Sequence, residues 1–161
     1  MSEQPKLGLT TARQAVVAVL AGALVCGLIL AAFELTGRFP PVVPWTVPLL
    51  FVLLAVAVVV YARMFPKRLE ERRVNSQEAV AALGIGKSAL MTGALFAGAH
   101  VVYVVRYLQL FDAPLPEARV VQGTATIVTA LLLAGAGALL ERACAIHDED
   151  DDDQNGTAEP A

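Results

Sequence analysis

The sequence predicts an all-α, polytopic integral membrane protein: four transmembrane helices in a small bundle, with both termini in the cytoplasm. The chain has 161 residues, 57% of them hydrophobic, and a mean hydropathy of +0.62. Soluble domains are usually about 45–50% apolar. Asp, Glu, Lys and Arg are absent from four stretches, residues 14–33, 39–62, 88–105 and 120–140. Each stretch has about the 17–25 residues with which a helix crosses a bilayer, and none shows the alternation of a barrel strand.

The domain organisation follows from these stretches. Residues 1–147 are predicted to form the transmembrane domain, with helices at about 14–34, 46–64, 76–106 and 120–143. The first apolar stretch is longer than the core of a cleavable signal peptide, about 7–15 residues, so we expect a retained anchor. From His147 onward there are seven acidic residues and no Lys or Arg. Residues 148–161 are therefore predicted to be a disordered acidic cytoplasmic tail.

Local signals place the ends of the helices. A proline-rich connector, residues 34–48, separates the first helix from the second, because proline lacks a backbone donor and disfavours helix in the residue before it. Thr46 is predicted to cap the second helix. Asn75 and Glu78 have the spacing of a helix start. Pro114 lies in the short connector before the last helix.

Positive charge predicts the orientation, since Lys and Arg accumulate on the cytoplasmic side of membrane proteins. Eight such residues lie in the N-terminal lead, in the 63–78 segment and at Arg142, against three on the opposite side, Arg38, Arg106 and Arg119. This distribution predicts cytoplasmic termini and a plasma (inner) membrane location.

The 63–78 segment is expected to contact anionic lipid headgroups through five basic residues, which are Arg63, Lys67, Arg68, Arg72 and Arg73. Nucleic acid is not expected as a partner, because no clustered basic face with interleaved aromatics is present.

Two polar features within the predicted spans are candidate contacts. Lys87 and Glu141 lie 19 and 22 residues from the outer ends of their helices, at Arg106 and Arg119. At about 1.5 Å per residue both reach the cytoplasmic boundary, which predicts an interhelical ion pair. His100 lies deeper, in the outer half of the bilayer. No acid shares its depth, so a structural hydrogen bond to a neighbouring helix is favoured over a proton relay.

Rows of small residues predict close helix packing, because lipid provides no hydrophobic force that drives helices together and short side chains let backbones approach. The rows have a spacing of four residues in the first, third and last helices. They consist of Ala18, Gly22 and Cys26; of Ala89, Gly93 and Ala97; and of Ala130, Ala134 and Ala138. The pattern leaves open whether these contacts are internal or intermolecular.

The third and fourth helices resemble a small actinobacterial membrane-protein family of unknown function, domain-of-unknown-function family 3180. The residues that carry the resemblance are the Ala/Gly-rich segment 82–98, with its early Lys87-Ser88 pair, and Leu140-Glu141-Arg142-Ala143-Cys144 before the acidic tail. The resemblance implies four helices and no established activity. The family tends to have an aromatic pair where Ala99-His100 stand and an Arg where Ala145 stands, so this chain departs from it there.

No set of residues predicts catalysis. The sequence has no metal-spaced His/Cys group, no nucleophile with its base and no pair of buried carboxylates, so no enzyme activity, cofactor or metal is expected. The predicted role is that of an accessory or scaffold subunit in the plasma membrane, with a membrane-protein partner or as a homo-oligomer. The alternative is a small transporter or channel acting as an oligomer, for which His100 and the entry at Pro48 are the only pointers.

Overall fold

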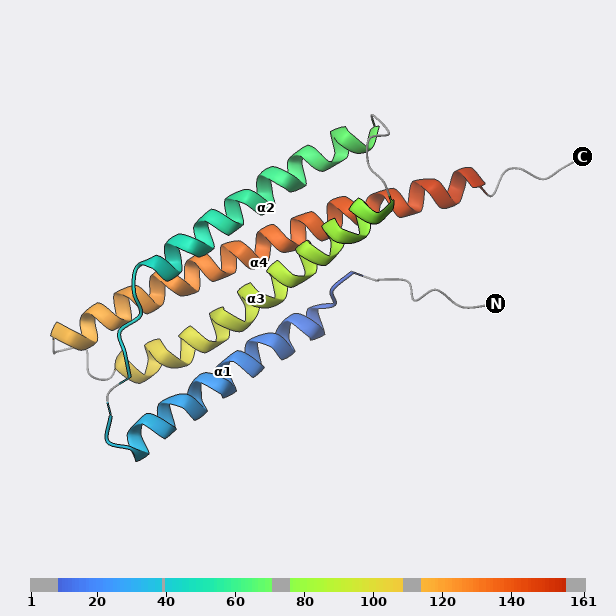
Figure 1. Cartoon of the computed structure of the whole chain (residues 1–161). Helices are drawn as coiled ribbons and strands as arrows, with labels where there is room; N and C mark the ends of the chain where they lie inside the picture. The colour runs from blue at the N-terminus through green and yellow to red at the C-terminus, as the bar shows by residue number, and fades with distance from the viewer. Residues whose placement is uncertain (1–8, 39, 71–75, 109–113, 156–161) are drawn as a thin grey trace, which may run out of the picture.

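The prediction of four long apolar helices is confirmed by the computed structural model, which describes residues 9–38, 40–70, 76–108 and 114–155. The helices are α1 Ala12–Leu35, α2 Thr46–Glu70, α3 Ser76–Leu108 and α4 Pro114–Asn155. Each contains a segment long and apolar enough to cross a membrane, of 24, 19, 32 and 28 residues in chain order. They run alternately up and down, so that α1 starts and α4 ends at the same end of the molecule (Figure 1). We call this the termini-bearing end and the other the distal end.

The capping signals explain where α1 begins and ends. Thr11 and Gln14 form a capping box, in which each side chain accepts a hydrogen bond from the other's backbone N–H, at 3.3 and 3.1 Å. At the other end Gly37 has φ +63°, a left-handed conformation that glycine adopts without strain. The Gly37 and Arg38 N–H groups then donate to the Glu34 and Phe33 carbonyls, the pattern of a Schellman motif. Both boundaries of α1 are therefore determined locally.

The C-terminal boundary differs from the prediction. α4 continues to Asn155, so residues 148–155 are helical where disorder is predicted from the sequence. Extending an existing helix adds one hydrogen bond per residue without a new nucleation cost, which explains how α4 runs on into the acidic segment. Residues 156–161 of the predicted tail lie outside the described residues. The other predicted helices are also longer in the structure, by a turn or two at most.

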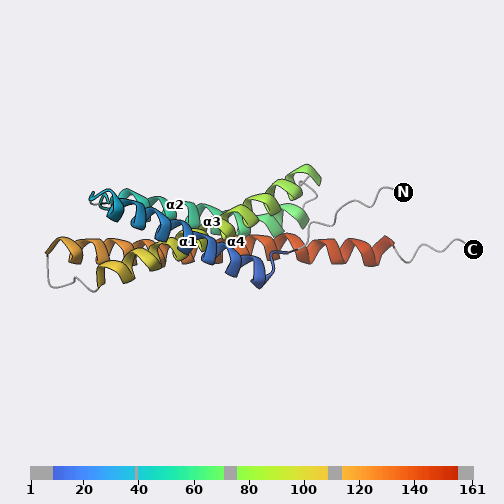
Figure 2. The ribbon, with the colours of Figure 1, turned by 90° about the horizontal axis from the view of Figure 1, so that it is seen from below.

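The helices form a staggered row instead of a closed bundle. Within the described part of the chain the extensive contacts are α1 with α3, α3 with α4, and α4 with α2. Figure 1 shows this order across the molecule, α1–α3–α4–α2, and Figure 2 shows the row nearly edge-on. α3 and α4 lie at the centre, and α1 and α2 lie at the edges. Short connectors explain the order only in part, because α2 packs on α4 and not on α1.

The central pair, α3 and α4, packs backbone against backbone. A Cβ atom added to Gly93 would lie 2.4 Å from the Ala130 carbonyl oxygen, and one added to Gly137 would lie 2.5 Å from the Gly86 carbonyl oxygen. Only glycine allows such an approach. α1 is joined to α3 in the same way, since a Cβ on Gly22 would lie 1.9 Å from the Leu95 carbonyl oxygen.

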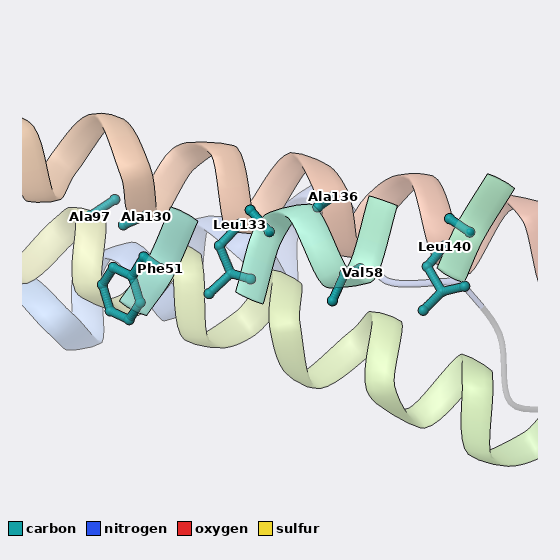
Figure 3. Close-up of a cluster of buried hydrophobic side chains, with 9 residues drawn as sticks. Phe51, Val58, Ala97, Ala130, Leu133, Ala136 and Leu140 are labelled. Carbon is teal, nitrogen blue, oxygen red and sulfur yellow. The ribbon is translucent and has the colours of Figure 1, made fainter. Parts of the chain in front are cut away.

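α2 packs on α4 through larger side chains. Phe51, Ala55, Val58 and Ala62 form one buried stripe of α2 and meet the α4 residues Ala130, Leu133, Ala136 and Leu140. Figure 3 shows the labelled members of this cluster side by side, with Ala97 of α3 at one end. The Phe51 ring also meets the Phe96 ring edge-on at 5.0 Å between centroids, which links α2 to α3.

We predict opposite effects for two glycine-to-alanine changes in α1. Gly22→Ala should lower the free energy of unfolding by about 1–3 kcal/mol, because the added methyl group forces the α1 and α3 backbones apart. Gly27→Ala is the matched control: its added Cβ would meet nothing within 4 Å. It should raise stability by up to about 1 kcal/mol through helix propensity. Denaturant unfolding of the purified protein in detergent measures both, and equal effects would contradict the α1–α3 crossing.

Candidate functional site

The carboxylate of Glu141 is the most deeply buried charged group in the described part of the chain. Its residue is 3% exposed, and it lies against Gly86 of α3, where an added Cβ would come within 3.2 Å of its side chain. Thr10, the residue just before the N-cap of α1, completes the site. Its hydroxyl donates a hydrogen bond to Glu141 Oε1, and its backbone N–H donates to Glu141 Oε2 at 3.2 Å. Thr10 and Glu141 thus connect the start of α1 to α4 across the termini-bearing end.

This geometry corrects the predicted Lys87–Glu141 ion pair. Gly86, the residue before Lys87, faces Glu141, and successive helix positions point about 100° apart. The structure accordingly forms no ion pair between Lys87 and Glu141, both of which it describes. Equal depth along two helices was the basis of the prediction, but depth does not specify which way a side chain points.

Polar contacts also gather at the distal end. The Arg106 Nε donates to Glu34 Oε1 at 2.8 Å, an ion pair between α3 and the end of α1 whose side chains are 49% and 57% exposed. Such exposed pairs contribute about 0–1 kcal/mol. On the other side of the row, the Gln122 amide, oriented to satisfy both neighbours, donates to the Val43 carbonyl at 2.8 Å. It also accepts from the Trp45 indole N–H at 3.1 Å. The connector before α2 is thereby fixed to α4.

His100 belongs to a column of rings along α3. Its Nδ1–H donates to the Phe96 carbonyl at 2.9 Å, one turn earlier in the same helix. The ring centroids of His100 and Tyr103 lie 6.2 Å apart, and those of Tyr103 and Tyr107 lie 4.9 Å apart. A hydrogen bond to its own helix satisfies one ring nitrogen, whereas a neighbouring helix is the partner expected from the sequence. A carbonyl oxygen can only accept, so the Nδ1 atom carries the proton in this bond.

The column ends at Arg119 of α4. Its guanidinium carbon lies 4.8 Å from the Tyr107 ring centroid, and its Nη1 donates to the Tyr107 hydroxyl at 2.9 Å. Tyr103 is 6% exposed, and its hydroxyl has no hydrogen-bond partner among the described residues. A buried, unpaired hydroxyl is costly and needs an explanation. It is the one polar side-chain atom of this kind in the described part of the protein.

The predicted small-residue rows take different places. Gly22 lies at the α1–α3 crossing, and Cys26 lies near the backbone of Tyr103. Ala18 lines an open groove between α1 and α3. In the central pair, Gly93 faces both Ala130 and Ala134.

The remaining members of these rows are less directly opposed. Ala97 is buried in the α2–α4 cluster, Ala89 packs against its edge, and Ala138 is half-buried. The rows therefore contribute to contacts within one chain wherever an opposing backbone is close.

Sequence reasoning missed several glycines that determine the packing. Gly86, Gly98, Gly123 and Gly137 all stand where a Cβ would clash with an opposing helix, at 3.1 Å or less. Gly86 and Gly93 are seven residues apart and share a helix face, so a search at the seven-residue spacing would have found the α3 side of the contact. Gly98 lies four residues after Ala94, but Leu90 and Val102 occupy the next positions at that spacing, so the two do not form a row of three.

The basic residues predicted to contact headgroups are only partly described. Arg63 is exposed in α2 at the termini-bearing end. Lys67 and Arg68 lie in the last turns of α2. Arg72 and Arg73 lie outside the described residues. Across the described ranges no group of three or more His, Cys, Asp or Glu side chains could hold a metal ion.

A family model matches most of the chain, residues 15–148, and is described as a protein of unknown function, DUF3180. The chain belongs to the DUF3180 family. The match includes α2, α3, Glu141 and most of α1 and α4, while Thr10 and Arg13 precede it. Neither the curated proteins nor the solved structures contain a significant match. Membership in the DUF3180 family therefore identifies the chain without assigning it an activity.

We predict that Thr10 and Glu141 are energetically coupled and that Lys87 and Glu141 are not. A double-mutant cycle with Thr10→Val and Glu141→Gln should give a coupling energy of about 0.5–3 kcal/mol, because the two groups share hydrogen bonds. The matched cycle with Lys87→Met and Glu141→Gln should be additive within about 0.5 kcal/mol. Both are measured by unfolding in detergent. Coupling between Lys87 and Glu141 without coupling between Thr10 and Glu141 would contradict the observed contact and support the ion pair predicted from the sequence.

Proposed function

We propose that this member of the DUF3180 family is a non-catalytic, multi-pass protein of the plasma membrane that serves as an accessory or scaffold subunit. One observation carries the proposal: the helices form an open row with uncovered apolar faces. α4, for example, exposes Val128, Leu131, Leu132 and Leu139 along one face. Lipid tails can cover such a face, and so can the helices of a partner, because the two are equally apolar.

The orientation proposed for this protein has both termini in the cytoplasm. The distribution of positive charge supports it, since Arg13, Arg63 and Arg142 all lie at the termini-bearing end of the row while Arg38, Arg106 and Arg119 lie at the distal end. Trp45 also lies at the distal end, where an interfacial aromatic is expected. The basic residues at the termini-bearing end would then face the anionic lipids of the cytoplasmic leaflet.

The packing favours a scaffold over a transport path through the single chain. The α1–α3 and α3–α4 contacts are made backbone to backbone. Hydroxyl groups in the middle of the helices bond within their own helix: Thr126 donates to the Gln122 carbonyl at 2.8 Å, and Thr129 donates to the Ala125 carbonyl at 3.0 Å. A transport site would instead direct such groups toward a shared cavity.

A small oligomeric transporter or channel remains the second candidate, and a specific observation favours it. The unpaired hydroxyl of Tyr103 and the free Nε2 of His100 lie on neighbouring turns of α3, within the predicted span. Polar atoms without a partner at such a depth are a functional-site hypothesis by default. A path along them would need the contribution of a second copy of the chain.

Cysteine labelling tests the orientation. In a variant without native thiols, single cysteines at Thr36 and Asp112 should react with an impermeant reagent in intact cells. Cysteines at Asn75 and Gln154 should react only after the cells are opened. Labelling of the Gln154→Cys variant in intact cells would place the C-terminus outside and reverse the orientation.

Purification of the tagged protein in mild detergent separates the two functions. A scaffold should retain a membrane-protein partner in fixed stoichiometry, whereas a transporter should appear as a homo-oligomer alone. Gly135→Trp on the exposed face of α4 and Leu53→Trp on the exposed face of α2 form a matched pair, since neither side chain is packed within the row. Loss of the partner with one variant and not the other would assign the interface to that helix. Absence of any partner would contradict the scaffold proposal.

A further inference from the structure

The groove between α1 and α3 at the termini-bearing end has a volume of about 510 Å³. Its floor is apolar and consists of Val17, Ala18 and Ala21 of α1 together with Met91 of α3. Its rim carries polar side chains from the first turn of α1, including Arg13 and Gln14. The volume falls within the range of small-ligand sites, about 300–1,000 Å³. An apolar floor with a cationic rim is an amphipathic arrangement.

The crossing of α1 and α3 creates this groove. The two helices touch where Gly22 meets the Leu95 backbone and where Gly98 meets the Val19 backbone. From there they diverge toward the termini-bearing end, as Figure 2 shows. Beyond the groove, Thr10 bonds to Glu141 and holds the start of α1 in place. The groove is therefore bounded by two fixed contacts and does not depend on the conformation of a loop.

The rim offers hydrogen-bond donors and positive charge. Arg13 is exposed and forms no ion pair with a described carboxylate. The Gln14 side-chain oxygen accepts from the Thr11 N–H, so the amide NH₂ is the part of this side chain that can donate to a ligand. From Arg13 to Ala21 the groove extends eight residues, roughly 12 Å along the helix axis. A ligand that fits would have an anionic group at one end and a narrow apolar chain of about that length or more.

We propose that this groove binds an anionic phospholipid of the cytoplasmic leaflet, with its phosphate at Arg13 and one acyl chain along Val17, Ala21 and Met91. This inference rests on the membrane insertion and orientation proposed above. Charge distinguishes the lipid from a second copy of the chain. A symmetric copy packed on this groove would bring its own Arg13 next to this one, and like charges in contact oppose association.

Lipid retention by the purified protein tests the site. The full chain is exchanged into detergent with phosphatidylglycerol or with phosphatidylcholine of identical acyl chains, and bound lipid is counted by native mass spectrometry. Phosphatidylglycerol should be retained about fivefold more strongly, the effect expected of one cationic side chain near an anionic headgroup. Arg13→Gln should abolish this preference. The matched control, Arg38→Gln, removes an exposed cation at the distal end of the row and should leave the preference unchanged.

A second pair of variants tests the floor of the groove. Ala21→Phe should lower retention of both lipids by filling the groove, while Ala32→Phe, at an exposed position in the distal half of α1, should not. Equal losses from Arg13→Gln and Arg38→Gln would show that the preference reflects general charge attraction and would overturn the site. If the protein is a dimer and Ala21→Phe dissociates it, the groove binds a second copy of the chain, and the proposed lipid site is also overturned. Recovery of the protein in the soluble fraction would instead contradict the membrane insertion on which the site rests.

Discussion

The close approach of α3 and α4 is the constraint on which the rest of the structure depends. In the bilayer proposed for this chain, burying an apolar side chain between helices gains little, because lipid tails are as apolar as leucine. Close backbone contact gains dispersion energy that lipid cannot replace, and Gly86, Gly93 and Gly137 permit it. With this pair fixed, α1 and α2 each attach to one outer side. α1 uses a glycine crossing, and α2 uses larger side chains around Phe51 and Leu133.

Polar groups are divided between the middle and the ends of the row. In the middle, Thr126 and His100 bond to carbonyl groups of their own helices and add little to helix association. At the ends, polar groups connect elements that are otherwise separate. Glu141 binds Thr10 at one end, and Gln122 connects to Trp45 at the other. The register of the helices therefore comes from glycine contacts in the middle and from hydrogen bonds at the ends.

An open row also has consequences for function. In a closed bundle the apolar surfaces face one another, whereas here α1 and α2 are edge helices and α4 exposes a continuous face. The DUF3180 family has no established activity from which a role could be transferred. The two surfaces proposed for binding differ in chemistry: the α4 face is wholly apolar and suits helices or lipid tails, while the α1–α3 groove adds the charge of Arg13. A scaffold subunit can use both at once.

The sequence by itself determined the number of helices, their approximate limits and the segregation of positive charge, because these depend on local composition. Apolar stretches of bilayer length, the Thr11–Gln14 cap and the left-handed Gly37 act within a few residues of one another. The tertiary structure decided the order of the helices, the Glu141–Thr10 contact and the groove beside Arg13. These depend on which helix faces meet, and a four-residue spacing of Ala and Gly does not specify the opposing face. Residues 131 positions apart, such as Thr10 and Glu141, leave no local signal of their pairing, since only the packing of α1, α3 and α4 brings them together.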